Sequence, residues 1–207
     1  MPENLHKLFV ISSPSGGGKT SLINKLFEDS RSANFEKSIS DTSRQKRQGD
    51  LEGKDYYFLS EKDFKDKIKK EEYVEYATVF GNFYGTSKEE IKTKYNNSNL
   101  ILELDWQGAY AVKELFDDAK LIFLVPPSLD DLKQRLIKRN LDSSKEIESR
   151  LSEAKKEISK SEMYDYLVLN DDFHKAFEDL SQILFEGISP IDFNSRASKD
   201  LIKRLVE

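Results

Sequence analysis

The chain has 207 residues, a length that suits one compact unit with inserted subdomains rather than several independent domains. Its 33 Lys and Arg residues against 38 Asp and Glu residues give a net charge of -5, which argues against nonspecific nucleic-acid binding, because such binding needs clustered cations. With no cysteine and two histidines, the chain has no disulfides, thiolate metal sites, cysteine nucleophiles or His-rich zinc sites.

The first predicted elements are a buried strand and a helix. Residues 8–11 form a continuous apolar run, typical of a strand buried on both faces, and the apolar residues of 20–27 recur at helical spacing. Further strands are predicted at 100–104, 121–125 and 166–169, and further helices at 106–116, 128–138, 145–160 and 173–185. Alternating strands and helices predict the α/β class, with a parallel sheet covered by helices. All apolar runs are far shorter than the roughly 20 residues that span a bilayer, so we expect a soluble cytoplasmic protein without a membrane partner.

Residues 36–95 interrupt this alternation. They contain a Ser/Thr/Arg-rich loop, a short aromatic strand at 56–58, a charged helix at 61–71 and an aromatic extended run at 73–84. No linker rich in Pro, Gly or Ser separates them from the rest, so we expect an inserted α+β subdomain. Residues 189–207 predict a loop and a short amphipathic helix.

The loop after the first strand has the composition of a phosphate-binding loop (P-loop). It consists of Ser13, Pro14, Ser15, Gly16, Gly17, Gly18, Lys19 and Thr20. Glycines let consecutive N–H groups surround phosphate oxygens at the helix N-terminus, Lys19 can reach the β- and γ-phosphates, and Thr20 can ligate Mg²⁺. Ser13 stands where the general pattern has glycine, so we expect a tight but workable turn. The alternative is a Gly-rich connection with an incidental lysine.

An acidic residue follows the strand at 100–104. A carboxylate here, at Asp105, is expected in a P-loop protein to orient Mg²⁺ or its water. Asp105 could equally be the N-cap of the helix that begins at Trp106. Its combination with a P-loop favours the metal role, so the predicted metal residues are Thr20 and Asp105.

A second anion site is predicted in the inserted subdomain. Arg44 and Arg47 lie three residues apart in a hydroxyl-rich loop, and two guanidinium groups can bind phosphate oxygens bidentately. The hydroxyls of Tyr56 and Tyr84 can donate to the same phosphate. By themselves, such residues are more often solvated arginines and core aromatics.

Glu75 is a candidate for base recognition, because a carboxylate accepts two parallel hydrogen bonds from N1–H and the exocyclic amine of guanine. Adenine lacks that donor pair and would leave the carboxylate unpaired. Ser40 and Thr86 could bind O6 or N7 of the purine. The alternative for Glu75 is an exposed strand acid.

Six motifs, in order, resemble the guanylate kinase family over about residues 5–186. They are the P-loop at 13–20, Ser-Asp-Thr-Ser-Arg-Gln-Lys-Arg at 40–47, Gly-Lys-Asp-Tyr at 53–56, Phe-Gly-Asn-Phe-Tyr-Gly-Thr at 80–86, Asp-Trp-Gln-Gly at 105–108 and Val-Leu-Asn-Asp-Asp at 168–172. The resemblance implies Mg²⁺-dependent transfer of the ATP γ-phosphate to GMP, and to dGMP, within purine nucleotide metabolism and GMP recycling.

The resemblance also implies roles for individual residues. The GMP phosphate is assigned to Arg44, Arg47, Tyr56 and Tyr84, guanine to Ser40, Glu75 and Thr86, the region between the nucleotides to Glu103 and Asp105, the adenine side to Asn170, and catalysis to Lys19, Arg135, Arg139 and Arg150. Two positions depart from the family: Glu103 stands where Asp is usual, and Lys138-Arg139-Asn140 stands where Gly-Arg-Gly is usual.

The implied organisation is a single domain. Its core covers about 5–35, 96–126 and 161–187, the GMP-binding subdomain about 36–95, a helical lid about 127–160 and a helical tail about 188–207.

There are two alternative functions: a noncatalytic guanylate-kinase-like module that binds peptides, and a regulatory GTPase. The intact Gly18-Lys19-Thr20 disfavours the first. The second would read guanine with an Asn-Lys-x-Asp motif. Asn24-Lys25 continues as Leu26-Phe27 and so does not form this motif. Homo-oligomer formation is left open.

Overall fold

A computed structural model describes residues 6–79, 81–139, 144–189, 191 and 195–206. Five parallel strands form its central sheet, in the order β2-β7-β1-β8-β9. Their bounds are β1 Leu8–Ser12, β2 Phe35–Lys37, β7 Asn99–Glu103, β8 Lys120–Val125 and β9 Tyr166–Leu169. The predicted α/β class and parallel sheet are confirmed. The edge strand β2 was not predicted, because its sequence, Phe-Glu-Lys, lacks an apolar run.

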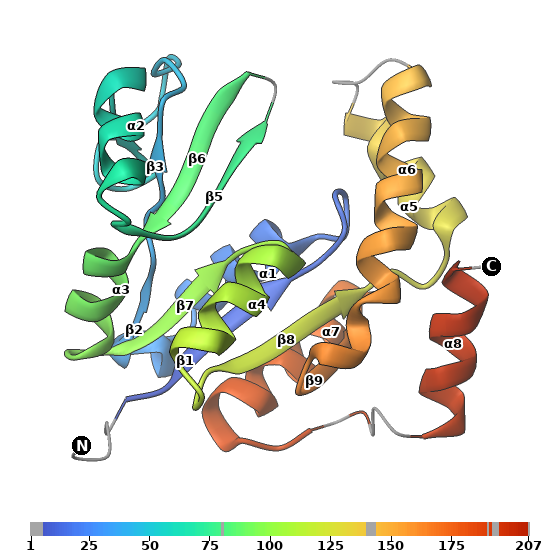
Figure 1. The fold of residues 1–207 in the computed structure, drawn as a ribbon. Coiled ribbons are helices and arrows are strands. Elements are labelled where there is room, and N and C mark those ends of the chain that lie inside the picture. Colours follow the sequence, from blue (N-terminus) through green and yellow to red (C-terminus); the bar gives the residue numbers. More distant parts are fainter. Residues whose placement is uncertain (1–5, 80, 140–143, 190, 192–194, 207) are drawn as a thin grey trace.

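Helices cover both faces of this sheet, as Figure 1 shows. In β1, Phe9 and Ile11 pack into a core with α1 (Lys19–Phe27) and α7 (Phe173–Ser181), while Leu8 and Val10 face the opposite core. That second core is formed with α3 (Lys88–Tyr95), α4 (Trp106–Leu115), α6 (Ser144–Ser159) and α8 (Arg196–Val206). The strand alternation with period two therefore fills two cores at once.

The inserted subdomain has its own sheet, in the order β4-β3-β6-β5. The strands are β3 Asp41–Thr42, β4 Tyr57–Phe58, β5 Tyr73–Val79 and β6 Asn82–Ser87, and α2 covers Glu61–Lys69. Phe64 of α2 is fully buried and stacks on Tyr73 and Phe83, with ring centroids 4.5 and 5.3 Å apart. The run predicted as one extended segment at 73–84 belongs to two antiparallel strands, β5 and β6.

One helix of this region was not predicted. α3 follows β6 directly, and the Ser87 hydroxyl accepts a hydrogen bond from the backbone N–H of Glu90. The Ser-x-x-Glu spacing of these residues is the sequence signal of a capped helix start.

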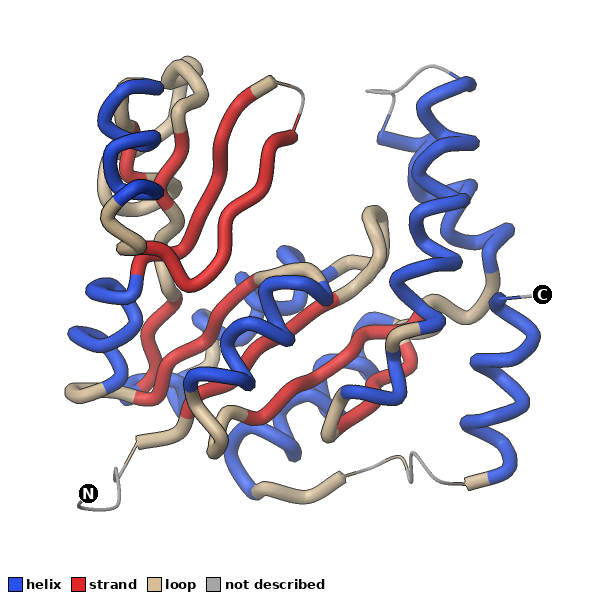
Figure 2. The backbone as a smooth tube through the Cα atoms, in the orientation of Figure 1, coloured by secondary structure: helices blue, strands red, loops and turns tan. Residues whose placement is uncertain are grey.

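The predicted lid corresponds to α5 (Leu129–Arg139) and α6, which pack together. Figure 1 shows α5 and α6 on one side of the P-loop and the inserted subdomain on the other. In Figure 2 the P-loop is the loop drawn at the carboxyl end of β1. α8 packs on α6 and buries Leu205, so the predicted amphipathic tail helix is part of the core. Short 3-10 segments cover Ser30–Asn34 and Ser161–Met163, and a π-helical turn covers Gln182–Glu186. Within the described residues, no helix has the length and apolar character to cross a membrane.

Candidate functional site

The P-loop joins β1 to α1, as predicted. Gly16 and Gly18 have φ angles of 88° and 90°, a left-handed conformation that favours glycine. Ser13 is buried, and its Cβ would lie 2.8 Å from a Cβ placed on Gly17, so Ser13 requires a glycine at that position. The Gly17 N–H donates to the Pro14 carbonyl oxygen at 2.8 Å. The loop therefore forms a tight turn with Ser13 at its first position, and residues 13–20 line a cavity of about 140 Å³.

Lys19 and Thr20 each contact the end of β7. Lys19 Nζ donates to the Leu104 carbonyl oxygen at 3.0 Å, and Thr20 Oγ1 donates to Glu103 Oε1 at 2.5 Å. Burial lowers the pKa of Lys19, while the negative charges of Glu103, Glu157 and Asp105 act in the opposite direction. A hydroxyl whose proton is donated to a carboxylate keeps its lone pairs for a cation, so Thr20 is oriented as a metal ligand requires.

Asp105 is the N-cap of α4. Its Oδ1 accepts hydrogen bonds from the backbone N–H groups of Gln107 and Gly108, both at 2.9 Å. The helix-cap interpretation from the sequence is therefore what the structure shows, and the carboxylate in contact with Thr20 is Glu103. A metal role for Asp105 stays a prediction.

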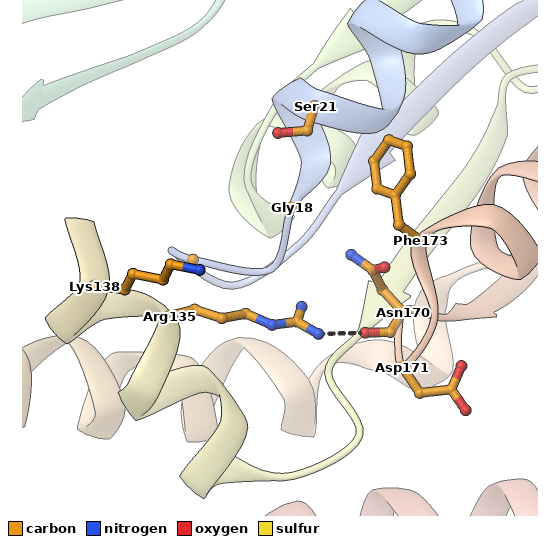
Figure 3. A pocket seen from close by; sticks show the side chains of 8 residues that line it. Gly18, Ser21, Arg135, Lys138, Asn170, Asp171 and Phe173 are labelled. Carbon is orange, nitrogen blue, oxygen red and sulfur yellow. Dashed lines mark hydrogen bonds between the residues drawn. The ribbon is translucent and has the colours of Figure 1, made fainter.

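A cavity of about 340 Å³ lies beside the P-loop and is shown in Figure 3. It is lined by Gly16, Gly18, Ser21, Arg135, Lys138, Asn170, Asp171 and Phe173. Because the cavity opens beside the P-loop, it is the candidate place for the base and ribose of the triphosphate.

Asn170 connects this cavity to the P-loop. Its buried Nδ2 donates to the Gly17 carbonyl oxygen at 2.7 Å, and a Cβ on Gly18 would lie only 2.4 Å from Nδ2. Its backbone oxygen accepts from Arg135 Nη2 at 2.7 Å, the bond drawn dashed in Figure 3. Asn170 therefore supports the P-loop and holds an arginine of α5 at the same time.

Two of the three predicted catalytic arginines reach the P-loop region. Arg150 Nη1 donates to Ser15 Oγ at 2.6 Å, and Arg135 is held by the Asn170 carbonyl. Arg139 is the last residue of α5, and its side chain lies outside the described residues, as does all of Asn140.

The predicted phosphate residues of the inserted subdomain come together around Arg44. Its guanidinium lies 5.5 Å from the ring centroid of Tyr56, and the rings of Tyr56 and Tyr84 meet edge to face at 5.7 Å. Arg44 Nη2 pairs with Asp50 Oδ2 at 2.9 Å, and the same oxygen accepts from the backbone N–H of Arg47 at 2.7 Å. The Arg47 side chain is exposed. Arg44, which was predicted to bind phosphate, thus forms an ion pair with the carboxylate of Asp50.

The predicted base-recognition residues are joined by hydroxyl groups. Thr86 Oγ1 donates to Glu75 Oε1 at 2.7 Å, and Ser40 Oγ lies 3.5 Å from Thr86 Oγ1. Burial raises the pKa of Glu75, Asp105 adds to the rise, and the hydrogen bonds from Thr86 oppose it. Glu75 is therefore not the exposed strand acid of the alternative interpretation.

A cavity of about 310 Å³ lies between the P-loop and the inserted subdomain. It is lined by Lys19, Thr20, Lys37, Ser38, Ser40, Lys54, Asp55, Tyr56, Thr86, Glu103 and Leu104. Within the described residues, no three His, Asp or Glu side chains form a metal-binding cluster. A hydroxyl backed by one carboxylate fits Mg²⁺, which binds proteins through one or two ligands and takes the rest from phosphates and water.

Sequence reasoning missed Lys37 and Glu157. Lys37 stands in the unpredicted edge strand β2 and pairs with Glu103. Glu157 follows Arg150 by seven residues on α6, a spacing that places both on one helix face and was the available signal. Burial raises the pKa of Glu157 to about 7, Asp105 and Glu153 add to the rise, and Lys19 opposes it.

Comparisons with known proteins identify relatives over nearly the whole chain. The family model "Guanylate kinase" matches residues 5–187. A guanylate kinase of Wolbachia sp. subsp. Brugia malayi is 46% identical over 184 residues, covering 88% of this chain and 93% of the relative. One from Hahella chejuensis is 47% identical over 178 residues, covering 86% and 85%. A crystal structure of guanylate kinase from Anaplasma phagocytophilum matches with a TM-score of 0.70 and 32% identity, over 99% of this chain and 98% of that one.

Replacing Asn170 tests its support of the P-loop. We expect Asn170→Ala to weaken binding of ATP and of GTP to a similar extent, about ten-fold, because the lost bond leaves a buried loop carbonyl unsatisfied whatever the base. Calorimetric titration measures both affinities. Asn97→Ala, which removes an exposed amide that donates to the Thr93 carbonyl at 2.7 Å, is the matched control and should bind as wild type does. A loss confined to ATP would instead make Asn170 an adenine contact only.

Glu157 predicts a pH-dependent stability. Its pKa rises from 4.5 to about 7 on folding, so the folded protein keeps a proton that the unfolded chain releases. Stability from this group is therefore present below pH 4.5 and lost as the pH rises to about 7. We expect Glu157→Gln to raise the melting temperature relative to wild type at pH 8 by at least about 2 °C, and by less at pH 5.

Thermal unfolding at the two pH values measures this difference. Glu148→Gln, the same change at an exposed position of α6, is the control. An equal effect of Glu157→Gln at pH 5 and pH 8 would contradict the raised pKa.

Proposed function

The chain belongs to the guanylate kinase family, and from this premise we propose that the two sites described above bind ATP and GMP for phosphoryl transfer between them. Transfer of the ATP γ-phosphate to GMP is the known activity of the family. The observation that carries the assignment of residues is the cavity of about 310 Å³, which is lined both by Lys19 and Thr20 of the P-loop and by Ser40, Tyr56 and Thr86 of the inserted subdomain.

The donor site is the P-loop with the cavity beside it. The N–H groups of Gly16 to Thr20 and the N-terminus of α1 would surround the β- and γ-phosphates, and Lys19 would leave the Leu104 carbonyl to reach them. Thr20 and Glu103, with Asp105 through water, would hold Mg²⁺, which when bound neutralises charge on the β- and γ-phosphates. Asn170 and the cavity of Figure 3 would take the adenosine.

The acceptor phosphate would replace Asp50 on Arg44. A phosphate dianion offers more oxygens to a guanidinium than a carboxylate does, and Arg47, Tyr56 and Tyr84 supply further donors. Before GMP binds, the Asp50 carboxylate keeps the charge of Arg44 paired.

Guanine would be selected by Glu75. Its ionised carboxylate would accept from N1–H and the exocyclic amine, and Thr86, which donates its hydroxyl proton to Glu75, holds it in place. The Ser40 hydroxyl, 3.5 Å from Thr86 Oγ1, would donate to O6 or N7. AMP would leave this partly buried carboxylate unpaired, which costs several kcal/mol in comparable cases. By resemblance to the family, dGMP is an expected acceptor as well.

The transfer step needs position and charge rather than a strong base, because the GMP phosphate is itself the nucleophile. Lys19, Arg135, Arg139 and Arg150 would stabilise the negative charge that spreads over the transferring group. Approach of the inserted subdomain and the α5–α6 pair would exclude water and limit ATP hydrolysis. We place this reaction in cytoplasmic purine nucleotide metabolism and GMP recycling.

A coupled ADP-release assay tests the function. With Mg²⁺ and ATP present, we expect GMP and dGMP to stimulate turnover, and AMP to have a kcat/KM at least about 100-fold lower, because of the unpaired Glu75. CMP and UMP are tested in parallel. If no monophosphate stimulates ADP release, the kinase assignment is wrong. If AMP and GMP are turned over equally, the proposed role of Glu75 is wrong.

Arg44→Ala tests the acceptor-phosphate assignment. Loss of a charge-assisted hydrogen bond should raise the KM for GMP by about 10- to 100-fold and leave the KM for ATP within about two-fold of wild type. The control is Arg31→Ala, which removes an exposed arginine that pairs with Asp29 at 2.6 Å and does not line the cavity. An unchanged KM for GMP would remove Arg44 from the site.

A further inference from the structure

Glu103 has two charged or polar partners on opposite sides. Its Oε1 accepts from Thr20 Oγ1 at 2.5 Å, and its Oε2 pairs with Lys37 Nζ at 2.6 Å. The side chain of Glu103 is 17% exposed and that of Lys37 is 36% exposed. Glu103 therefore bridges the P-loop and the edge strand β2, and both of its oxygens are engaged.

The backbone around Lys37 is fixed by strand pairing. Lys37 lies opposite Ile101 on β7, two residues before Glu103. Its carbonyl oxygen accepts from Lys94 Nζ at 2.8 Å, and the N–H of Ser38 donates to the Ile101 carbonyl at 2.9 Å. The ammonium group therefore approaches Glu103 from a firmly held position.

This ion pair faces the acceptor side of the site. Lys37 and Glu103 line the cavity of about 310 Å³ together with Ser40, Tyr56 and Thr86. The Glu103 carboxylate, in an ion pair with the Lys37 ammonium group, thus faces the cavity that a GMP dianion would enter.

Two anions in one cavity repel each other unless a cation stands beside one of them. When neither ATP nor Mg²⁺ is bound, Lys19 Nζ donates to the Leu104 carbonyl oxygen, so among the described residues the cation in direct contact with Glu103 is Lys37. An aspartate is shorter by one methylene group, and the longer Glu103 is what contacts Thr20 and Lys37 at once in this chain.

We propose that Lys37 is a positioning residue for acceptor binding: it holds and neutralises the Glu103 carboxylate, so that GMP can enter the cavity, without itself binding the GMP phosphate. This inference rests on the proposed function. It predicts that the need for Lys37 disappears when the charge of Glu103 is removed.

The test is calorimetric titration of GMP into the protein, with EDTA and without ATP, at low ionic strength. Lys37→Met should weaken GMP binding about ten-fold, because it leaves Glu103 unneutralised beside the incoming anion. The double variant Lys37→Met with Glu103→Gln should bind GMP within about two-fold of wild type, and so should Lys37→Arg, because both keep the cavity wall neutral. Thermal unfolding establishes that each variant is folded.

The control is Lys25→Met, which makes the same change in net charge at an exposed α1 ion pair with Glu28 at 2.9 Å. It should bind GMP as wild type does. Unchanged binding by Lys37→Met would overturn the inference and make the pair an ordinary surface ion pair. A double variant as weak as Lys37→Met would also overturn it, because either Lys37 or Glu103 would then contact GMP directly. Wild-type protein that binds no GMP would instead defeat the proposed function.

Discussion

Five cations of the site are each held by an oxygen of the protein itself. An unpaired charge in a partly buried site costs several kcal/mol, so the site needs such partners in order to fold. The pairs are Lys19 with the Leu104 carbonyl, Lys37 with Glu103, Arg44 with Asp50, Arg135 with the Asn170 carbonyl and Arg150 with the Ser15 hydroxyl. Most of these oxygens belong to neutral groups, which a phosphate can displace at low cost. A chain with net charge -5 can in this way keep a local site for two anions.

The parallel sheet explains how these cations meet. β1 and β7 end side by side, which brings Thr20 of the P-loop to Glu103. The next strand outwards, β2, adds Lys37 and leads into the inserted subdomain with Arg44. On the other side, the segment after β9 carries Asn170, which holds both the P-loop and the lid helix α5. The residues proposed for the donor, the acceptor and the lid are thus positioned by the carboxyl ends of strands in one sheet.

Local patterns were predictable from the sequence, and contacts across the fold were less so. The P-loop follows from eight consecutive residues, and the grouping of Arg44, Tyr56 and Tyr84 follows from their chemistry. The contact of Glu103 with Thr20 depends on strand register and on the reach of the glutamate side chain, which the sequence pattern does not show. The sequence favoured Asp105, which caps α4 and whose metal role stays a prediction. Lys37 was missed because β2 is a three-residue edge strand without an apolar pattern.

The central claim is that nucleotide phosphates take over cations that the protein otherwise pairs internally. A crystal structure of the protein with GMP and a nonhydrolysable ATP analogue tests it directly. The account predicts that the GMP phosphate replaces Asp50 on Arg44, that Lys19 leaves the Leu104 carbonyl for the β- and γ-phosphates, and that Lys37 stays on Glu103. A complex in which the Arg44–Asp50 pair persists and the GMP phosphate binds elsewhere would contradict it.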